Sequence, residues 1–253
     1  MSTVIAAIDD SAAARPVLAT AQAVAAFWDA HVEALHVTED DGHTALGAAD
    51  AADVPMRVEP GDVAARLVEA TTDPDVVAIV IGARARPGSR RPAGHVVVEL
   101  ITRCAKLVIV VPPDARHKAG IRRLVIALEG TALSSDALKP AMELGHRQDV
   151  EVLVVHVDDE ASIPLFSDQP QHETRAFATE FLARYGTDSD GLPALELRVG
   201  EPAEQVLSVC DDTAADMLVV AWSCSLASGR ARFVRHVLEH SHIPVMLVPC
   251  GPG

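Results

Sequence analysis

The sequence predicts an α/β fold in which two similar domains, each built on a doubly wound parallel sheet, follow one another in one chain. Short runs rich in Val and Ile alternate with Ala-rich segments of helical length, the pattern of parallel strands joined by crossover helices. Apolar residues make up 49% of the 253 residues but aromatic residues only 3%, as suits aliphatic strands covered by Ala-rich helices. The same order of elements also occurs twice.

The first half begins with an expected strand at Val4–Ile8. Asp9, Asp10 and Ser11 follow it and offer the side-chain oxygens that cap helix N-termini. The next segment, 12–28, has helical spacing, with Pro16 near its start, where the missing N–H does least harm. Further strands are expected at 32–37, 76–81 and 107–111, and further helices at 62–71 and 95–105.

The second half repeats these features in the same order. The pair His36-Val37 has a counterpart in His156-Val157, and Gly61 has one in Gly200. The final strand, Val108–Pro112, has its counterpart in Val245–Pro249. These matches predict a first domain at 1–113, a linker at 114–121 and a second domain at 122–253. Extra residues at 158–192 are interpreted as a variable surface insertion with mobile ends rather than as a lid.

The formal net charge is −15, so phosphate backbones and anionic membranes would be repelled. We therefore expect no nucleic-acid partner and no membrane partner. No apolar run is long enough to cross a bilayer and no signal peptide precedes the first strand. The four cysteines include no CxxC pair, which favours a reducing compartment. The expected location is the cytoplasm.

Each half resembles the universal stress protein domain. The matching features include a strand that ends in acidic and Ser residues, His-Val at the end of the second strand, and a Pro-Val-x-x-Val-Pro closing strand. The second half also matches at Arg198–Ala203 and Ile243–Pro249. The resemblance implies a Rossmann-like fold of the adenine-nucleotide-hydrolase type, with five mostly parallel strands in each domain.

Many members of that family bind ATP through Gly-x-x-Gly, nine residues, and then Gly-Ser or Gly-Thr. Glycines let the backbone approach the phosphates, and the helix that follows presents its positive end to them. The first half keeps Gly82, but Ala85 replaces the second glycine and only eight residues precede Gly94. The resemblance implies a site made of Asp9, Val37, Gly82, Arg84, Gly94 and His95.

The second half departs further from the motif. Ala221 and Cys224 replace the leading glycines, Ala231-Arg232 replaces the closing pair, and Glu129 replaces the aspartate. No cofactor is therefore expected there, and ATP in the first domain is kept as an alternative. Arginines gather in both loops, at Arg84, Arg86, Arg90 and Arg91 and at Arg230, Arg232 and Arg235. They either cradle an anion or fill a solvated surface loop, and we favour the second interpretation.

Other candidate sites are weaker. His236 and His240 have the i, i+4 spacing of a zinc-binding pair, but no further ligand accompanies them at a recognisable spacing. Cys224 lies near an arginine-rich loop and could be a reactive thiol, although an inert one is favoured. No Gly-x-Ser-x-Gly elbow follows a strand, so a hydrolase triad is not supported. We expect no enzyme activity; an ATP hydrolase rests on the family resemblance alone.

The expected function is a stress-response module that acts through its folded, pseudo-dimeric structure, without ordinary ATP binding. The alternative is a nucleotide sensor that uses the first domain only. Family members commonly dimerise through the edge of the last strand, so we expect strands 107–112 and 244–249 to pair within the chain. The resulting monomer could form a homodimer.

Overall fold

The computed structural model describes residues 1–11, 13–38, 52–83, 94–115, 120–128, 138, 140–141, 150–158, 194–225 and 230–250. Its strands are β1 (Thr3–Ile8), β2 (His31–Thr38), β3 (Met56–Pro60), β4 (Val76–Gly82), β5 (Leu107–Val111), β6 (Arg123–Ala127), β7 (Glu151–Asp158), β8 (Ala194–Val199), β9 (Met217–Trp222) and β10 (Val245–Pro249). Its helices are α1 (Ala14–Ala25), the short 3₁₀ helix η1 (Ala26–Trp28), α3 (Val63–Ala70), α4 (His95–Arg103), α7 (Pro202–Asp212) and α8 (Arg230–His240).

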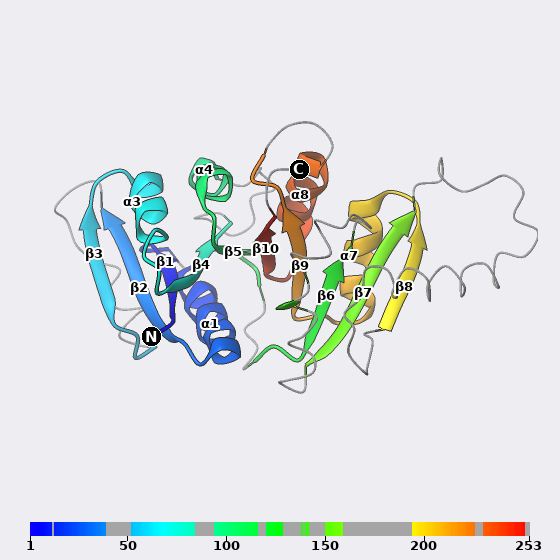
Figure 1. Ribbon diagram of the computed structural model, residues 1–253, viewed down its shortest axis with the longest axis horizontal. Coiled ribbons are helices and arrows are strands. Elements are labelled where there is room, and N and C mark those ends of the chain that lie inside the picture. Colours follow the sequence, from blue (N-terminus) through cyan, green and yellow to red (C-terminus); the bar gives the residue numbers. More distant parts are fainter. Residues whose placement is uncertain are drawn as a thin grey trace, which may run out of the picture.

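The ten described strands form one sheet in the order β3-β2-β1-β4-β5-β10-β9-β6-β7-β8 (Figure 1). All neighbouring strands are parallel except β5 and β10, which run antiparallel at the centre. There, Val108, Ile109 and Val110 lie opposite Leu247, Met246 and Val245. The predicted α/β fold class is confirmed, and the strands of the two halves are continuous in a single sheet.

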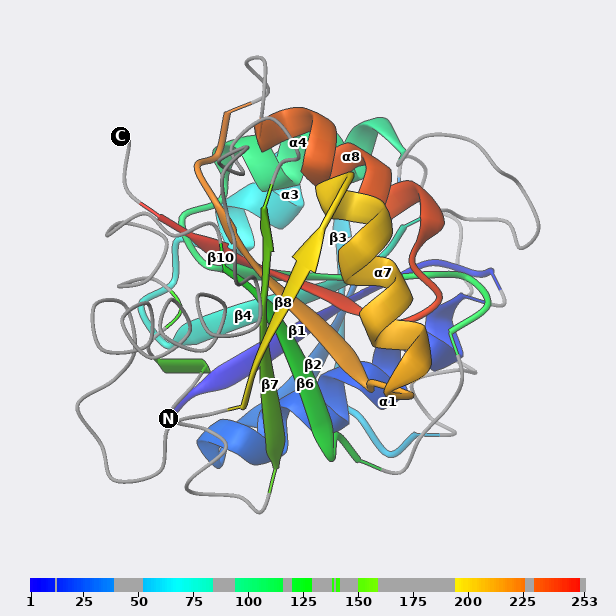
Figure 2. The ribbon, with the colours of Figure 1, turned by 90° about the vertical axis from the view of Figure 1, so that its right-hand side faces the viewer.

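The helices cover both faces of this sheet. One apolar cluster contains the buried side of α1, with Val17, Leu18 and Val24, and lies on one face. The other contains buried residues of α3, α4, α7 and α8 and lies on the opposite face. Figures 1 and 2 show α1 at the bottom of the molecule and α3, α4 and α8 at its top. Because both faces are covered, the inner strands consist almost entirely of Val, Ile, Leu and Ala.

Gly61 and Gly200 occupy the same place in the two halves. Both have strongly positive φ, at 130° and 131°, a conformation that side-chain-bearing residues rarely adopt. Their N–H groups donate to the last residues of equivalent strands, Thr38 O in β2 and Asp158 O in β7. An acidic N-cap follows each glycine, with Asp62 Oδ1 accepting from Ala65 N and Glu201 Oε2 from Ala203 N. The local backbone is therefore repeated along with the order of the elements.

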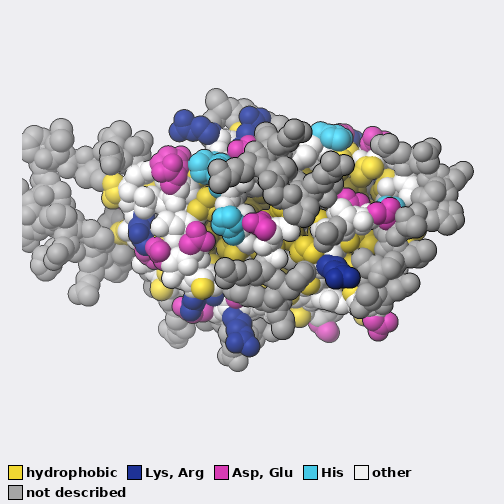
Figure 3. Space-filling model, turned by 180° about the vertical axis from the view of Figure 1, so that it is seen from behind, with side chains coloured by type: hydrophobic (Ala, Val, Ile, Leu, Met, Phe, Trp, Pro, Cys, Tyr) yellow, Lys and Arg dark blue, Asp and Glu magenta, His cyan; other side chains and the backbone are white. Residues whose placement is uncertain are grey.

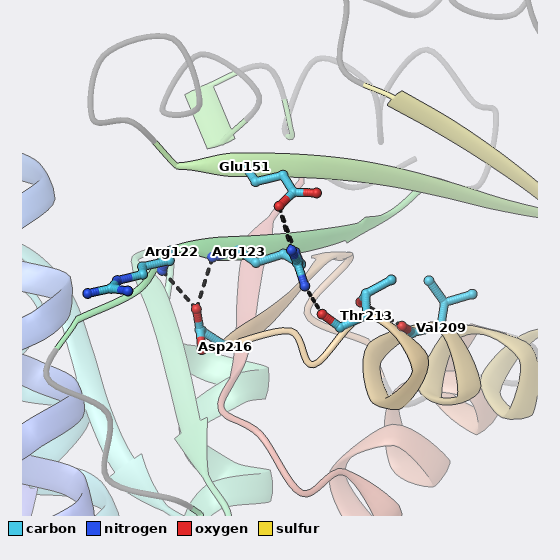
Figure 4. A network of polar contacts seen from close by, with 6 residues as sticks. All are labelled: Arg122, Arg123, Glu151, Val209, Thr213 and Asp216. Atoms are coloured by element: carbon cyan, nitrogen blue, oxygen red, sulfur yellow. Dashed lines mark hydrogen bonds and ion pairs between the residues drawn. The ribbon is translucent and has the colours of Figure 1, made fainter.

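A polar network fixes the start of the C-terminal half (Figure 4). Asp216, just before β9, accepts hydrogen bonds from the backbone N–H groups of Arg122 (2.8 Å) and Arg123 (2.9 Å). The Arg123 guanidinium contacts Glu151 of β7 and the carbonyl oxygen of Thr213. The amino ends of β6, β7 and β9 are thereby joined through side chains from three segments.

Two edge strands were not predicted as strands. β3 and β8 form the two edges of the sheet among the described residues. Both alternate apolar and charged residues and are only partly buried, so they lack the continuous apolar runs that marked the inner strands. The segment interpreted as an insertion lies outside the described residues from 159 onwards, as do residues 116–119 of the expected linker.

The described surface carries scattered charges. In the view of Figure 3, acidic and basic side chains lie among uncharged ones without a block of one sign. No described helix is long and apolar enough to cross a bilayer.

Candidate functional site

A cavity of about 360 Å³ opens at the carboxyl ends of β1 and β4. The strand order reverses between these two strands, since the chain proceeds from β1 to β2 and β3 on one side and to β4 and β5 on the other. In open α/β sheets this reversal is where ligands bind. The lining residues include Ile8, Asp9, Val17, Leu35, Val37, Leu67, Ile81, Gly82, Ala83, Gly94, His95, Val96 and Val97. We call this cavity the first-half pocket.

The first-half pocket brings together five of the six residues predicted for the site: Asp9, Val37, Gly82, Gly94 and His95. They come from four separate segments, because the ends of β1, β2 and β4 and the start of α4 meet at one edge of the sheet. The sixth, Arg84, lies outside the described residues, as do the three other arginines of its loop.

Asp9 is the first residue after β1 and is exposed. Its Oδ1 accepts hydrogen bonds from the backbone N–H of Ser11 (3.0 Å) and from the Ser11 hydroxyl (2.5 Å). The hydroxyl oxygen of Ser11 in turn accepts from Ala13 N at 3.1 Å. These bonds stabilise the turn into α1, which begins at Ala14. Asp9 is therefore held by its own turn at the mouth of the pocket.

His36 of β2 holds the end of β1 that borders the pocket. Its Nδ1 lies 2.9 Å from the carbonyl oxygen of Ile8 at the end of β1, and because a carbonyl can only accept, Nδ1 carries the proton. His156 makes the equivalent contact with Leu128 O at 2.8 Å. These histidines join the ends of neighbouring strands in both halves. Val37, the next residue, lines the pocket.

The far wall is the start of α4. The Gly94 N–H donates to Ala83 O at 3.2 Å, and Ala83 N–H donates to Val111 O at 2.7 Å. Gly94 therefore lies next to Ala83, beside the end of β4. Gly94 is the N-cap and provides no side-chain cap, so the positive end of α4, beginning with His95, borders the pocket. This arrangement can accept an anionic or hydrogen-bond-accepting group.

Neither Gly82 nor Gly94 has a positive φ, the conformation for which glycine is favoured. Gly94 has φ of −58°, and an added Cβ would lie 3.8 Å from Ala83 O, an ordinary contact. Gly82 is also absent from the residues with positive φ. In the second half, however, Cys224 has φ of 54°. The left-handed backbone is present there at the position assigned to a motif glycine, although a cysteine occupies it.

The equivalent strand end in the second half carries Trp222. Gly82 lies opposite Val111 and Ala221 opposite Val248, so Trp222 takes the place of Ala83. Its side chain is buried, and its indole N–H donates to the carbonyl oxygen of Ile101 in α4 at 2.7 Å. Trp222 is not among the site residues predicted from the sequence. Two features of the sequence could have drawn attention to it. It is one of only two tryptophans in the chain, and it directly follows Ala221, which stands where the family motif has a glycine.

The histidine pair of α8 and the Ala231-Arg232 pair were two further features noted in the sequence. His236 and His240 stack with ring centroids 4.2 Å apart, and His240 Nδ1 lies 2.9 Å from His236 O. No group of three His, Cys, Asp or Glu side chains suited to a metal occurs within the described part of the chain. Ala231 and Arg232 lie inside α8, which begins at Arg230, so they do not occupy a helix N-cap. Arg232 and Arg235 are exposed.

The thiol of Cys224 is only partly buried, and its Sγ lies 3.7 Å from Cys104 O. Burial, together with the nearby thiols of Cys104 and Cys250, raises the pKa of Cys224 above its ordinary value of 9.0. Cys210, buried in α7, has its pKa raised to about 12 by burial and by the Asp211 carboxylate. Because the thiolate is the nucleophile, both shifts make these cysteines less reactive at neutral pH.

A second cavity, of about 370 Å³, lies between α1 and the C-terminal half. Pro16 and Thr20 of α1 line one side, and Asp211 and Ile243 line the other. At its margin His242 Nδ1 lies 3.2 Å from Asp114 Oδ2, a contact between the two halves. None of the site residues predicted from the sequence lies here.

Comparison with known proteins gives one family. The model of the universal stress protein family matches residues 120–249, and no curated protein matches the chain significantly. A universal stress protein from Archaeoglobus fulgidus DSM 4304 is 14% identical over 98% of both chains, with a TM-score of 0.69. A functionally unknown protein from Pseudomonas aeruginosa PAO1 is 11% identical over 99% of this chain and 93% of that chain, with a TM-score of 0.72. At these identities the likeness concerns the fold alone.

Proposed function

Because the chain belongs to the universal stress protein family, we propose that it is a regulatory module of a stress response that works through its paired halves and catalyses no reaction. The proposed domains are 1–113 and 122–253, joined by the linker at 114–121. The family match begins at residue 120, which supports this boundary. The four cysteines form no disulfide with one another, which suits a reducing compartment, and we propose that the module lies in the cytoplasm.

The observation that carries this proposal is the junction between the halves. β5 and β10 pair antiparallel through buried residues, including Ile109 and Met246. Trp222 adds a buried hydrogen bond to Ile101 across the same junction. A pairing that is buried, apolar and hydrogen-bonded holds the two halves as one unit. The chain thus contains within itself the strand pairing through which family members commonly dimerise.

A nucleotide sensor confined to the first half is the second candidate. The first-half pocket favours it, because five predicted site residues border one cavity and the uncapped start of α4 faces it. Against ordinary ATP binding stands the lining itself, which is mostly aliphatic and includes no described Lys or Arg. A triphosphate would therefore depend on backbone N–H groups and on the α4 N-terminus alone among the described groups.

Equilibrium dialysis of the whole chain against radiolabelled ATP separates the two candidates. The proposed module binds ATP no better than an unrelated acidic protein of similar charge and releases no nucleotide on denaturation. Saturable binding in the micromolar range, weakened at least tenfold by Asp9→Asn and unchanged by the matched surface variant Asp73→Asn, would establish the sensor instead. Phosphate release above the rate of buffer alone would overturn the proposal that the chain is not an enzyme.

A further inference from the structure

The C-terminal end of α4 receives hydrogen bonds from the other half of the chain. The last carbonyls of a helix lack partners within it, and Ile101 O is one of these. It accepts from the Trp222 indole N–H at 2.7 Å in a buried setting. Cys104, the C-cap of α4, has its carbonyl oxygen 3.7 Å from Cys224 Sγ. Trp222, the last residue of β9, and Cys224, which follows the strand, therefore contact the end of a helix that belongs to the first half.

α4 depends on such contacts because it is short. It has nine residues, and helices of this length are not stable by themselves in water. Val97, Leu100 and Ile101 are buried in an apolar cluster that also contains Trp222 of β9 and Val234 of α8. Figure 1 shows α4 between α3 and the second half, on the same side of the sheet as α8. The position of α4 is thus determined from both halves.

The other end of the same helix lines the first-half pocket. Gly94, His95, Val96 and Val97 border the cavity, whereas Ile101, only four residues after Val97, accepts the Trp222 hydrogen bond. Loosening one end of so short a helix also loosens its first turn, since helix formation is cooperative. The pocket and the junction are therefore connected through two and a half turns of backbone.

We propose that Trp222 is a positioning residue through which the C-terminal half holds the first turn of α4 and so sets ligand binding at the first-half pocket. The ligand-binding part rests on the sensor function proposed above. Ligand affinity and the Trp222 contact depend on each other. A ligand that binds better when the first turn of α4 is ordered must also stabilise the Trp222–Ile101 contact, by the same factor. Ala83, the counterpart of Trp222, has no polar side-chain atom and cannot give α8 the same cap. The halves therefore have different roles.

Hydrogen–deuterium exchange of the full chain without ligand tests the positioning role. Trp222→Phe keeps an aromatic ring but removes the N–H donor, leaving Ile101 O unpaired. We expect amides of α4, including those of Val98 and Glu99, to exchange roughly tenfold faster, the factor that corresponds to one lost buried hydrogen bond. Amides of α1 should keep their wild-type rates. Trp28→Phe removes the other tryptophan, which packs against the α1 cluster on the opposite face of the sheet; it is the matched control and should leave α4 unchanged.

A second variant keeps the test decisive if Trp222→Phe loosens the whole protein. His95 is the first residue of α4, where proline is well tolerated because that N–H needs no helical partner. Gly94, with ψ of 153°, already has the extended conformation that precedes proline. His95→Pro should therefore restore α4 protection in the Trp222→Phe chain at least threefold. Unchanged α4 exchange in Trp222→Phe, or no restoration by His95→Pro, would overturn the positioning role.

ATP serves as the probe for the ligand-binding part. If wild-type chain binds ATP, Trp222→Phe should raise its dissociation constant up to tenfold while Trp28→Phe leaves it unchanged. Equal affinity in all three chains would refute the coupling to the pocket. If ATP does not bind the wild-type chain, the sensor function fails, while the exchange rates of α4 still decide whether Trp222 positions this helix.

Discussion

The paired glycines Gly61 and Gly200 give the most direct test of the repeated backbone. Replacing either by alanine forces a side-chain-bearing residue to φ near +130°, a region that costs on the order of 1–3 kcal/mol. At Gly61 the new Cβ would also lie 3.2 Å from Arg66 Nε, which donates to Pro60 O. At Gly200 its nearest neighbour, Gln205 Nε2, is 3.4 Å away. We expect Gly61→Ala to be the more destabilising by a few tenths of a kcal/mol.

The assay is urea unfolding followed by circular dichroism and by tryptophan fluorescence, which reports on Trp28 in the first half and Trp222 in the second. In thermal unfolding, a loss of about 2 kcal/mol in the free energy of unfolding would lower the melting temperature of a chain of this size by roughly 4–8 °C. Gly120→Ala is the control, because a Cβ there would meet nothing within 4 Å and its φ is not left-handed. If Gly61→Ala and Gly200→Ala both stay within about 0.5 kcal/mol of wild type, the strain assigned to these positions is wrong.

Three further predictions follow from the polar contacts. His36→Phe leaves Ile8 O without its buried donor and should destabilise the chain by about 1–3 kcal/mol in urea unfolding; a loss below 0.5 kcal/mol would contradict the strand-joining role. Asp216→Ala removes the acceptor of two backbone N–H groups and should lower stability by about 2 kcal/mol, whereas Asp216→Asn, which keeps one oxygen, should lose less; equal losses would mean that the acceptor is unimportant. Cys224, with its raised pKa, should react slowly with iodoacetamide at pH 7.5 and faster as the pH passes 9, because only the thiolate reacts; mass spectrometry of the labelled peptide measures this, and a rate that is flat above pH 7 would contradict the shift.

The inner part of the fold was predictable because its signals are local. Strands such as β4 and β10 are continuous apolar runs of the length expected for buried parallel strands. Gly61 and Gly200 could be matched by sequence, and the structure gives both the same φ. The edge strands β3 and β8 escaped prediction, because their charged residues alternate with apolar ones and their identity depends on a neighbouring strand.

The candidate site was predictable in part. Asp9, Gly82 and Gly94 were expected from the family resemblance, and they lie at or beside the ends of β1, β4 and α4, which meet at one edge of the parallel sheet. Trp222 was not predictable in this way. Its partner Ile101 is 121 residues away, and the contact exists only because β5 and β10 place α4 of one half beside β9 of the other.

The continuous sheet also changes how many open edges the protein must protect. Two separate five-stranded sheets would expose four edge strands, whereas the ten described strands leave two, β3 and β8. Each carries an arginine held by glutamates, Arg57 by Glu33 and Glu59 and Arg198 by Glu196. Charged residues on an edge discourage another strand from adding to it. Among the described strands, joining the halves at β5 and β10 thus leaves two open edges, both charged, which disfavours the addition of strands from other molecules.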